Sequence, residues 1–402
     1  MSLEDRWRAL DDRIRAWWDD DLHHATEERV RADPDGTLLF LPHPYSSAAG
    51  AEAAFPEMYG WDTYFINCGL LAHDRPDIVR GHILNQIFLI ERYGFVPNGN
   101  RTFYLTRSQP PLLGESVRRY VEATGDREVA QRARLALAKE YLHFWDVPPR
   151  RTPCGLSTCS DAGDPARRPE LAAEAESGRD FTAIYGGDVR RCVPLHVNAA
   201  LVRTARCLTW LAELLDDDDE ATRWTLEADT RARLLRELCW SSEAQTFLQW
   251  NWIIEEHLPH RSLDALWVVW CGAATLEQAA AVAEDCTRFL HPAGLAFTEA
   301  AHPSPHPEYT WLQWGYPSGW PGEQIIAVEA LDQAGRPDLA AEVARRYLTA
   351  QLDLYDRTGH LWEKLSVVSG TTDLPRERYA TPAFHGWSSA SVALLGRRLF
   401  ED

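Results

Sequence analysis

Two carboxyl groups stand out in this sequence because each lies in a polar stretch that also carries aromatic residues. Asp180 follows a flexible Ser-Gly pair and precedes an aromatic residue, and Glu363 lies directly after Trp362. Hydrolysis of a glycosidic bond needs such a pair, because one carboxylic acid protonates the leaving oxygen and one carboxylate activates water or attacks. A proton donor at neutral pH also needs a raised pKa, which burial or a neighbouring carboxylate supplies. The alternative is a solvated ion-pair loop at each position, since Lys364 follows Glu363.

A second polar stretch, residues 97–111, is rich in amides, arginines and aromatic rings and lies between two helical patterns. Its Asn98-Gly99 pair is typical of a turn, because both residue types tolerate a positive φ. Planar donors beside flat rings suit a neutral ligand rich in hydroxyl groups, and the stretch has neither a phosphate cradle nor a nucleophile. A buried polar loop that ties two helices together is the alternative.

Two further stretches combine aromatic and acidic residues. Trp61-Asp62 lies beside Tyr59 and just before an apolar helical pattern, where an aspartate is most often a helix N-cap. Residues 311–323 hold four aromatic rings among glycines and prolines. Sugars bind on the faces of such rings, although capping of the hydrophobic core is the alternative.

The charge of the chain disfavours several classes of partner. The net charge is −19, from 41 basic and 60 acidic residues. Nucleic acids and anionic membrane surfaces are bound through lysine and arginine, so neither is an expected partner. The sequence also has no apolar run of 18 residues that would predict a membrane-spanning helix.

The eight cysteines are spread singly and show no CxxC pair and no metal-binding spacing with histidine. Several lie in apolar helical patterns, where a free cysteine behaves as a small hydrophobic residue. The N-terminal residues are charged and lack the apolar segment of a signal peptide. We therefore expect a cytoplasmic protein without a metal ion or cofactor.

Helical periodicity dominates the chain and predicts roughly a dozen helices joined by alternately short and long loops. Later helices are expected at about residues 194–215, 220–239, 263–272, 275–289, 319–335, 337–355 and 386–400, and only residues 247–256 suggest a short hairpin. Such a chain forms either an open solenoid or a double-layered α/α barrel, and the lack of a 34- or 40-residue repeat disfavours the solenoid. We expect an all-α single domain over residues 1–402, with an amphipathic helix within residues 1–30 packing on the barrel.

Several motifs, in order between about residues 55 and 390, resemble those of the inverting α,α-trehalase family. They are YGWDTY at residues 59–64, the loop at 98–111, ESGRD at 176–180, VPLHVN at 193–198, QWGYPSGW at 313–320, WEK at 362–364 and HGW at 385–387.

The resemblance implies an (α/α)6 barrel, no metal ion and inversion at the anomeric carbon, with Asp180 as general acid and Glu363 as general base. Inversion implies a separation of roughly 6.5–9.5 Å between the two carboxyl groups, which leaves room for water. The sugar pocket implied in this way is lined by Phe55, Tyr59, Trp61, Asp62, Asn98, Arg107, Gln109, Arg168, Glu170, Gln313, Trp314, Trp320, Glu377 and Trp387.

The chain departs from the family pattern around this expected site. Ala54 stands where the family has an arginine, and Gly315 stands where it has an aspartate. Residues 369–379 replace a glycine-rich lid, and Glu377 only roughly aligns with the glutamate of that lid. We therefore expect hydrolysis of a small neutral saccharide, trehalose or a similarly small α-glucoside. A glucosylglycerol or a glucosylglycerate is the alternative substrate.

Two functions from other classes stay open at this point. One is a sugar-binding protein without turnover on the same scaffold. The other is a sugar isomerase or epimerase that uses His196 and His385 for proton transfer. The sequence does not predict the oligomeric state.

Overall fold

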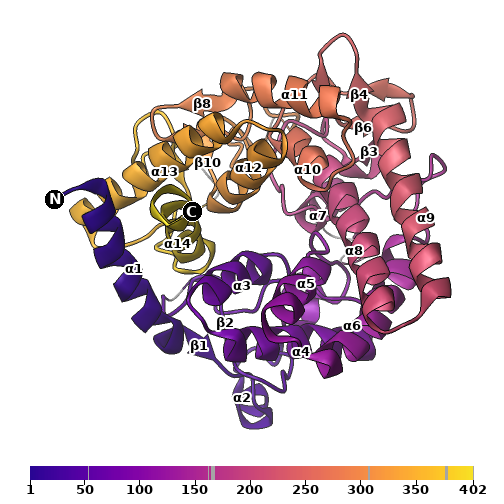
Figure 1. Ribbon diagram of the computed structural model, residues 1–402, viewed down its shortest axis with the longest axis horizontal. Helices are drawn as coiled ribbons and strands as arrows, with labels where there is room; N and C mark the ends of the chain where they lie inside the picture. The colour runs from indigo at the N-terminus through magenta and orange to yellow at the C-terminus, as the bar shows by residue number, and fades with distance from the viewer. Residues whose placement is uncertain (53, 162, 164–167, 307, 376–378, 402) are drawn as a thin grey trace.

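Six helices form a closed inner ring in the part of the chain that the structure describes. They are α3 (Asp62–Ala72), α5 (Leu113–Thr124), α8 (Leu195–Leu214), α10 (Asp264–Trp270), α12 (Pro321–Gln333) and α14 (Gly386–Phe400). The computed structural model describes residues 1–52, 54–161, 163, 168–306, 308–375 and 379–401. Each inner helix contacts the next, and the last of them, α14, contacts the first, α3 (Figure 1). This closure confirms the predicted barrel and rules out an open solenoid.

The inner helices are buried on nearly all sides, as α3 shows. Nine of its eleven residues are buried, among them the polar Asn67. The side-chain amide of Asn67 donates a hydrogen bond of 3.1 Å to the hydroxyl of Ser116 on α5. On the other side of α3, a Cβ atom added to Gly69 would lie only 2.9 Å from Cα of Ala390 on α14. The ring therefore closes through a close approach of two helix backbones.

An outer layer of helices surrounds this ring (Figure 1). It consists of α1 (Leu3–Asp20), α4 (Pro76–Tyr93), α6 (Arg127–Glu140), α9 (Asp218–Leu234), α11 (Leu276–Asp285) and α13 (Pro337–Thr358). Apart from α4, the outer helices bury mainly one face. In α9, for example, Ala221, Trp224, Ala228 and Ala232 are buried at helical spacing.

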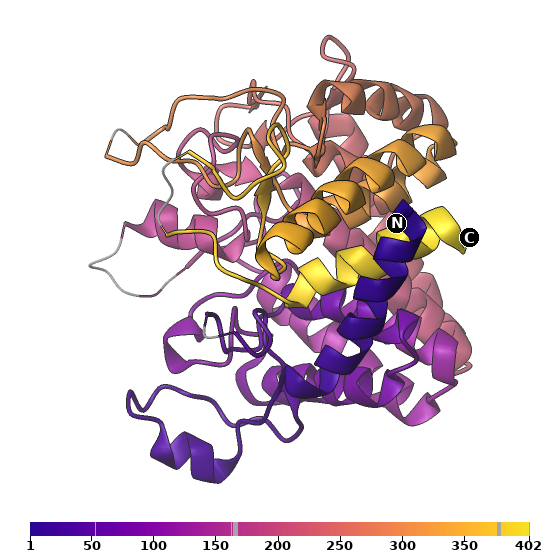
Figure 2. The same cartoon turned by 90° about the vertical axis from the view of Figure 1, so that its left-hand side faces the viewer.

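The N-terminal helix α1 packs on α13 and α14. The indole N–H of Trp7 donates to the carbonyl of Val392, at 3.1 Å, and Arg6 forms an ion pair with Asp353, at 2.7 Å. Figure 2 shows α1, in indigo, crossing these two C-terminal helices. The helix ends at Asp20, and residues up to 32 form strand β1 (Leu22–His23) and a short helix, α2 (Glu27–Ala32).

The strands of the described residues have two residues each and lie in loops. They are β2 (Tyr45–Ser46), β3 (Cys192–Val193), β4 (Trp240–Ser241), β5 (Thr246–Phe247), β6 (Trp250–Asn251), β7 (Glu256–His257), β8 (Leu290–His291), β9 (Gly294–Leu295), β10 (Ser318–Gly319) and β11 (Leu365–Ser366), besides β1. They pair antiparallel as β1–β2, β3–β6–β7, β4–β5, β8–β9 and β10–β11. The β6–β7 hairpin lies at the end of the stretch that suggested a hairpin, and the fold is all-α as predicted.

One local feature differs from the prediction. Helix α7 (Pro169–Glu176) is not among the helices that the sequence pattern predicted. Its eight residues are too few to show a periodic pattern, although a proline at its first position and an alanine-rich interior favour a helix.

The long loops that precede the inner helices meet at one end of the barrel. In Figure 2 these loops lie on one side of the molecule, and most of the helices lie on the other. Since each loop leads into the N-terminus of an inner helix, the N-terminal ends of several inner helices face this region. Among the described residues, no helix has both the length and the apolar character needed to cross a lipid bilayer.

Candidate active site

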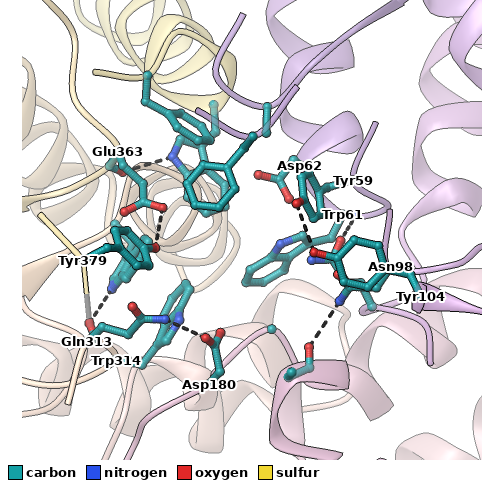
Figure 3. A pocket seen from close by; sticks show the side chains of 18 of the residues that line it. Tyr59, Trp61, Asp62, Asn98, Tyr104, Asp180, Gln313, Trp314, Glu363 and Tyr379 are labelled. Carbon is teal, nitrogen blue, oxygen red and sulfur yellow. Dashed lines mark hydrogen bonds between the residues drawn. The ribbon is translucent and has the colours of Figure 1, made fainter. Parts of the chain in front are cut away.

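A pocket of about 200 Å³ lies at the N-terminal ends of the inner helices, among the long loops (Figure 3). It is lined by Ala48, Phe55, Tyr59, Trp61, Asp62, Asn98, Tyr104, Arg107, Gln109, Ala175, Gly178, Asp180, Gln313, Trp314, Trp320, Glu363, Tyr379, Phe384 and Trp387. Thirteen of these nineteen positions are among the sixteen residues that the sequence suggested. They come from segments spread over more than 300 residues of the chain, so the tertiary structure assembles the pocket.

Asp180 reaches the pocket from a tightly constrained turn before α8. Gly178 has a φ of +70°, and a Cβ atom there would lie 2.9 Å from the ring of Trp61, so the turn requires glycine. Two residues after Asp180, Thr182 forms a parallel β-bridge with Trp314. Oδ2 of Asp180 accepts a hydrogen bond of 2.8 Å from the side-chain amide of Gln313. These contacts fix the direction in which the carboxyl group points.

Glu363 is buried in the opposite wall, and both oxygens of its carboxyl group are hydrogen-bonded. Nζ of Lys364 donates to Oε2 at 2.6 Å, and the hydroxyl of Tyr379 donates to Oε1 at 2.8 Å. The side chain of Lys364 is completely buried, so its ammonium group balances the charge of the Glu363 carboxylate. The indole N–H of Trp387 donates to the backbone carbonyl of Glu363 at 3.0 Å.

The segments that carry the two carboxyl groups are joined through a third segment. The bridge between Thr182 and Trp314 links the Asp180 segment to residues 313–320. Strand β10 within that segment then pairs with β11, which begins two residues after Glu363. In Figure 3, the side chains of Asp180 and Glu363 point into the same space. A chain of backbone pairing therefore couples the positions of the two carboxyl groups.

Asp62 supplies a third carboxyl group. It is the first residue of α3 and is buried, and its own side chain does not cap the helix, so the N-cap alternative is wrong. Burial raises the pKa of Asp62 to about 7, and the nearby carboxylate of Glu363 contributes to this increase. Asp62 is therefore a carboxyl group that can change its protonation state near neutral pH.

Indole rings make up much of the pocket wall. Trp314 and Trp320 are stacked, with centroids 4.0 Å apart and planes at 5°. Trp61 lies 5.7 Å from Trp314 and 5.9 Å from Trp387, measured between centroids. Flat apolar faces beside carboxyl and amide groups suit a ligand with both C–H and hydroxyl surfaces, such as a pyranose ring.

The polar loop at residues 97–111 forms another part of the wall. The backbone N–H of Trp61 donates to Oε1 of Gln109 at 3.1 Å, and the side-chain amide of Asn98 donates to the carbonyl of Ala175 at 3.3 Å. Arg107 forms an ion pair of 2.7 Å with Asp161. The alternative of a loop that ties structural elements together thus describes part of its role, since the loop also reaches the pocket.

Three residues from the expected pocket are not part of the described lining. Arg168 and Glu170 form an ion pair of 2.5 Å, and Arg168 also pairs with Glu308. These contacts hold the two side chains at the start of α7, away from the pocket wall. Glu377 lies outside the described residues.

The two histidines of the isomerase alternative also lie elsewhere. His196 is completely buried beneath the site, with Nε2 2.7 Å from the carbonyl oxygen of Ser177. Nδ1 of His385 lies 2.9 Å from Asp21, and its ring stacks on Trp17 with centroids 4.4 Å apart. The described lining of the pocket contains no histidine.

Sequence reasoning missed Tyr104, Tyr379 and Phe384, as well as the small residues Ala48, Ala175 and Gly178. Tyr104 lies in the polar loop at residues 97–111. The guanidinium carbon of Arg107 lies 5.0 Å from the centroid of its ring. Tyr379 lies two positions after Glu377, in the segment that replaces the lid. In both cases the sequence indicated the segment, but it did not show that this side chain points into the pocket.

The described residues also contain no group of three or more His, Cys, Asp or Glu side chains placed to hold a metal ion. The lining of the pocket offers carboxyl groups for acid–base chemistry. The Asp180 carboxyl group is hydrogen-bonded to the side-chain amide of Gln313. The Glu363 carboxyl group is hydrogen-bonded to the ammonium group of Lys364 and the phenol of Tyr379. This pair matches the requirements of acid–base hydrolysis of a glycosidic bond.

Comparison with solved structures defines the class of this protein. The neutral trehalase Nth1 of Saccharomyces cerevisiae superposes with a TM-score of 0.79 and 25% sequence identity over 94% of this chain and 80% of its own. A mannosylglycerate hydrolase of Thermus thermophilus has a TM-score of 0.65 at 18% identity, over 87% of this chain and 95% of its own, which supports the fold alone. The protein is a glycoside hydrolase with an (α/α)6 barrel.

The chain belongs to the trehalase family. The family model matches residues 4–167 and 172–397. A periplasmic trehalase of Pseudomonas aeruginosa is 30% identical over 90% of this chain and 72% of its own length. The cytosolic neutral trehalase of S. cerevisiae is 28% identical over 84% of this chain, which spans 53% of that longer protein.

Proposed function

We propose that this protein hydrolyses trehalose, or an α-glucoside of similar size with a neutral leaving group, and that it inverts the anomeric carbon. The observation that carries the proposal is the presence of Asp180 and Glu363 in one pocket walled by indole rings. Membership of the trehalase family and the names of the relatives support trehalose as the substrate. Both carboxyl groups are retained, which disfavours a protein that only binds sugar.

In the proposed reaction, the carboxyl proton of Asp180 passes to the glycosidic oxygen as the bond between that oxygen and the anomeric carbon breaks. Glu363 accepts a proton from a water molecule, whose oxygen bonds to the anomeric carbon from the opposite face. One water is consumed and two sugar products form. Lys364 and Tyr379 keep the Glu363 carboxylate oriented, and Gln313 orients Asp180.

The charges of the pocket favour a neutral leaving group over an acidic one. Among the described lining residues, Asp62, Asp180 and Glu363 carry carboxyl groups, and Arg107 is the one cationic side chain. Because Arg107 is already paired with Asp161, it is not available to balance the carboxylate of a glucosylglycerate. Trehalose and glucosylglycerol avoid this repulsion.

Proton NMR of the reaction tests the proposal directly. Inversion of α,α-trehalose releases β-glucose from the attacked ring and α-glucose from the leaving ring, so the first spectra should show equal amounts. Retention would give α-glucose alone. In water enriched with ¹⁸O, one of the two glucose molecules should carry the label. Isomerisation would release no free monosaccharide.

A panel of trehalose, glucosylglycerol and glucosylglycerate then identifies the leaving group. We expect kcat/KM to be at least about tenfold lower for glucosylglycerate, because a buried like-charge contact costs more than about 1.4 kcal/mol. Preferred cleavage of glucosylglycerate would contradict the neutral leaving group, and no cleavage of any of the three would contradict the proposed hydrolysis.

We also propose that the protein acts in the cytoplasm. Its eight cysteines all lie in the described part of the chain, and all are free thiols. The relatives named above include a periplasmic and a cytosolic protein. If the proposal is correct, alkylation of the denatured protein, isolated from its own cells without reductant, should modify eight thiols. Protection of two or more thiols would contradict a reducing compartment.

A further inference from the structure

A buried ionic cluster lies directly beneath the candidate site. It consists of Arg179, His196, Asp264 and Glu323, whose side chains are between 0 and 2% exposed. Nη2 of Arg179 lies 2.9 Å from Oδ1 of Asp264 and 2.8 Å from Oε1 of Glu323, so one guanidinium group joins two carboxylates. None of the four residues is in the described lining of the pocket.

The cluster joins the N-terminal ends of three neighbouring inner helices. His196 is in the first turn of α8, Asp264 is the first residue of α10, and Glu323 is in the first turn of α12. Carboxylates are favourable at such helix ends because of the helix dipole. Although burial raises the pKa of Asp264, the charges of His196 and Arg179 outweigh this effect, and the pKa is lowered.

Each member of the cluster is held by further hydrogen bonds. Gln249 donates to Oδ2 of Asp264 at 2.8 Å, and the indole of Trp267 donates to Oε2 of Glu323 at 3.0 Å. Nδ1 of His196 lies 3.2 Å from Oδ2 of Asp264. Nε2 of the same ring lies 2.7 Å from the carbonyl oxygen of Ser177.

The cluster contacts the pocket wall from behind. Arg179 is the residue immediately before Asp180, and its guanidinium carbon lies 4.4 Å from the ring centroid of Trp314 and 5.1 Å from that of Trp61. Both rings line the pocket. His196 contacts the carbonyl of Ser177, three residues before Asp180. The cluster therefore holds the turn that presents the Asp180 carboxyl group and two of the rings beside it.

We infer that Arg179, anchored by Asp264, Glu323 and His196, positions Asp180 for proton donation to the leaving group. The inference rests on the proposed glycosidase function. A displacement of about 1 Å at a reacting group can cost about 10²-fold in rate, and general acid catalysis contributes about 10²–10⁴-fold. Disturbing Arg179 should therefore affect substrates in proportion to their need for a proton.

The test compares two substrates in Arg179→Lys. Trehalose needs protonation of its leaving oxygen, whereas α-glucosyl fluoride loses fluoride as the anion when the C–F bond breaks and needs little acid assistance. Lysine keeps the positive charge but cannot join two carboxylates with one planar group. We expect kcat for trehalose to fall about 10²-fold and kcat for the fluoride to fall less than about tenfold.

Arg231→Lys is a matched control. Arg231 is also buried, at 1% exposure, and it also joins a network, with Asp146 3.1 Å and Glu227 3.5 Å away, but it is not in the described pocket lining. Its substitution should lower Tm yet leave the ratio of the two rates within about threefold of the wild-type ratio, because the site is not contacted.

Several outcomes would overturn the inference. A parallel loss of both activities in Arg179→Lys, or no loss of either, would show that Arg179 acts only on stability or not at all. If Arg231→Lys changes the ratio of the trehalose rate to the fluoride rate as much as Arg179→Lys does, the effect is not specific to Arg179, and the inference is wrong. If Arg179→Lys does not fold, Glu323→Gln removes one anchor of the guanidinium and is expected to change the ratio in the same direction. Failure of the wild-type protein to cleave either substrate would instead contradict the proposed function.

Discussion

The hydroxyl of Tyr379 donates a hydrogen bond of 2.8 Å to Oε1 of Glu363, although Tyr379 belongs to the segment that replaces the family's lid. Nζ of Lys364 donates a hydrogen bond of 2.6 Å to the other carboxylate oxygen, Oε2. The proposed general base is therefore oriented from both sides, once by its sequence neighbour and once by a residue 16 positions away. This second contact gives the altered segment a role in the proposed chemistry.

Tyr379→Phe removes this contact without changing the shape of the ring. A hydrogen bond to a charged group is worth about 1.5–3 kcal/mol, so we expect kcat on the best substrate to fall about 10- to 100-fold. Tyr347→Phe is the control, because its hydroxyl donates to the carbonyl of Gly319, at 3.2 Å, in the buried core. Unchanged kcat in Tyr379→Phe would show that Lys364 alone orients the carboxylate.

Replacement of either proposed catalytic carboxyl group should abolish most of the activity. We expect Asp180→Asn and Glu363→Gln each to reduce kcat by about 10²–10⁴-fold or more, since the amides neither donate nor accept the required proton. Glu363→Gln also leaves the buried ammonium of Lys364 without its counter-charge, so its Tm should fall.

Glu140→Gln serves as the control for this pair. Glu140 is a buried carboxyl group outside the pocket lining that accepts a hydrogen bond of 2.8 Å from the backbone N–H of Val96. An amide oxygen can accept the same bond, so activity should be retained. Wild-type turnover in Asp180→Asn or Glu363→Gln would mean that the proposed roles are wrong.

Asp62 should make the stability of the protein depend on pH. Its pKa is raised from 3.8 to about 7, so between these values the folded state binds a proton that the unfolded state has released. Its effect on the free energy of unfolding is therefore fully unfavourable above about pH 7 and disappears below about pH 4. Because one unit of pKa corresponds to 1.36 kcal/mol, the change amounts to about 4 kcal/mol.

Asp62→Asn, which mimics the protonated form, should therefore stabilise the protein relative to wild type more at pH 8 than at pH 4. Denaturant unfolding at several pH values measures this difference. Asp161→Asn should show the opposite sign. Burial raises the pKa of Asp161, but Arg107 together with hydrogen bonds from Thr106 and the backbone of Gly163 outweighs burial, and the pKa is lowered. An effect of Asp62→Asn that is the same at both pH values would argue against the raised pKa.

Gly178→Ala should disturb the turn that presents Asp180. A Cβ atom at this position would lie 2.9 Å from the ring of Trp61 and would also be strained by the φ of +70°. Gly125 has the same φ of +70° but no atom within 4 Å of an added Cβ, so Gly125→Ala measures the strain alone. Gly125→Ala should lose about 1 kcal/mol of stability, Gly178→Ala should lose more, and only Gly178→Ala should also lose activity, by tenfold or more. Equal activity in the two variants would contradict the packing of Gly178 against Trp61.

Much of the helical framework could be predicted from the sequence, because the pattern that indicates a helix lies within a single segment of the chain. The helix expected at residues 386–400 agrees with α14 in both of its ends, and the one expected at 194–215 differs from α8 by one residue at each end. Burial of one face produces a period that is visible within a single segment. Helix α7 was missed because its eight residues are too few for such a pattern.

The chemical character of the site was also visible in the sequence. Asp180, Glu363 and Trp314 occur in short stretches whose composition differs from the rest of the chain, and all three line the pocket. Residue type and local context are properties of the sequence itself. They indicated an uncharged ligand rich in hydroxyl groups before any contact between these stretches was known.

Only the tertiary structure decided which stretches meet and in which direction their side chains point. Closure of the ring depends on the contact of Gly69 with Ala390, which are 321 residues apart. Arg179, inside the ESGRD motif, turns away from the pocket and joins two carboxylates that are distant in the sequence, those of Asp264 and Glu323. The physical reason is that such contacts depend on the free energy of packing and of pairing charges across the whole barrel, and no local stretch of sequence contains both partners.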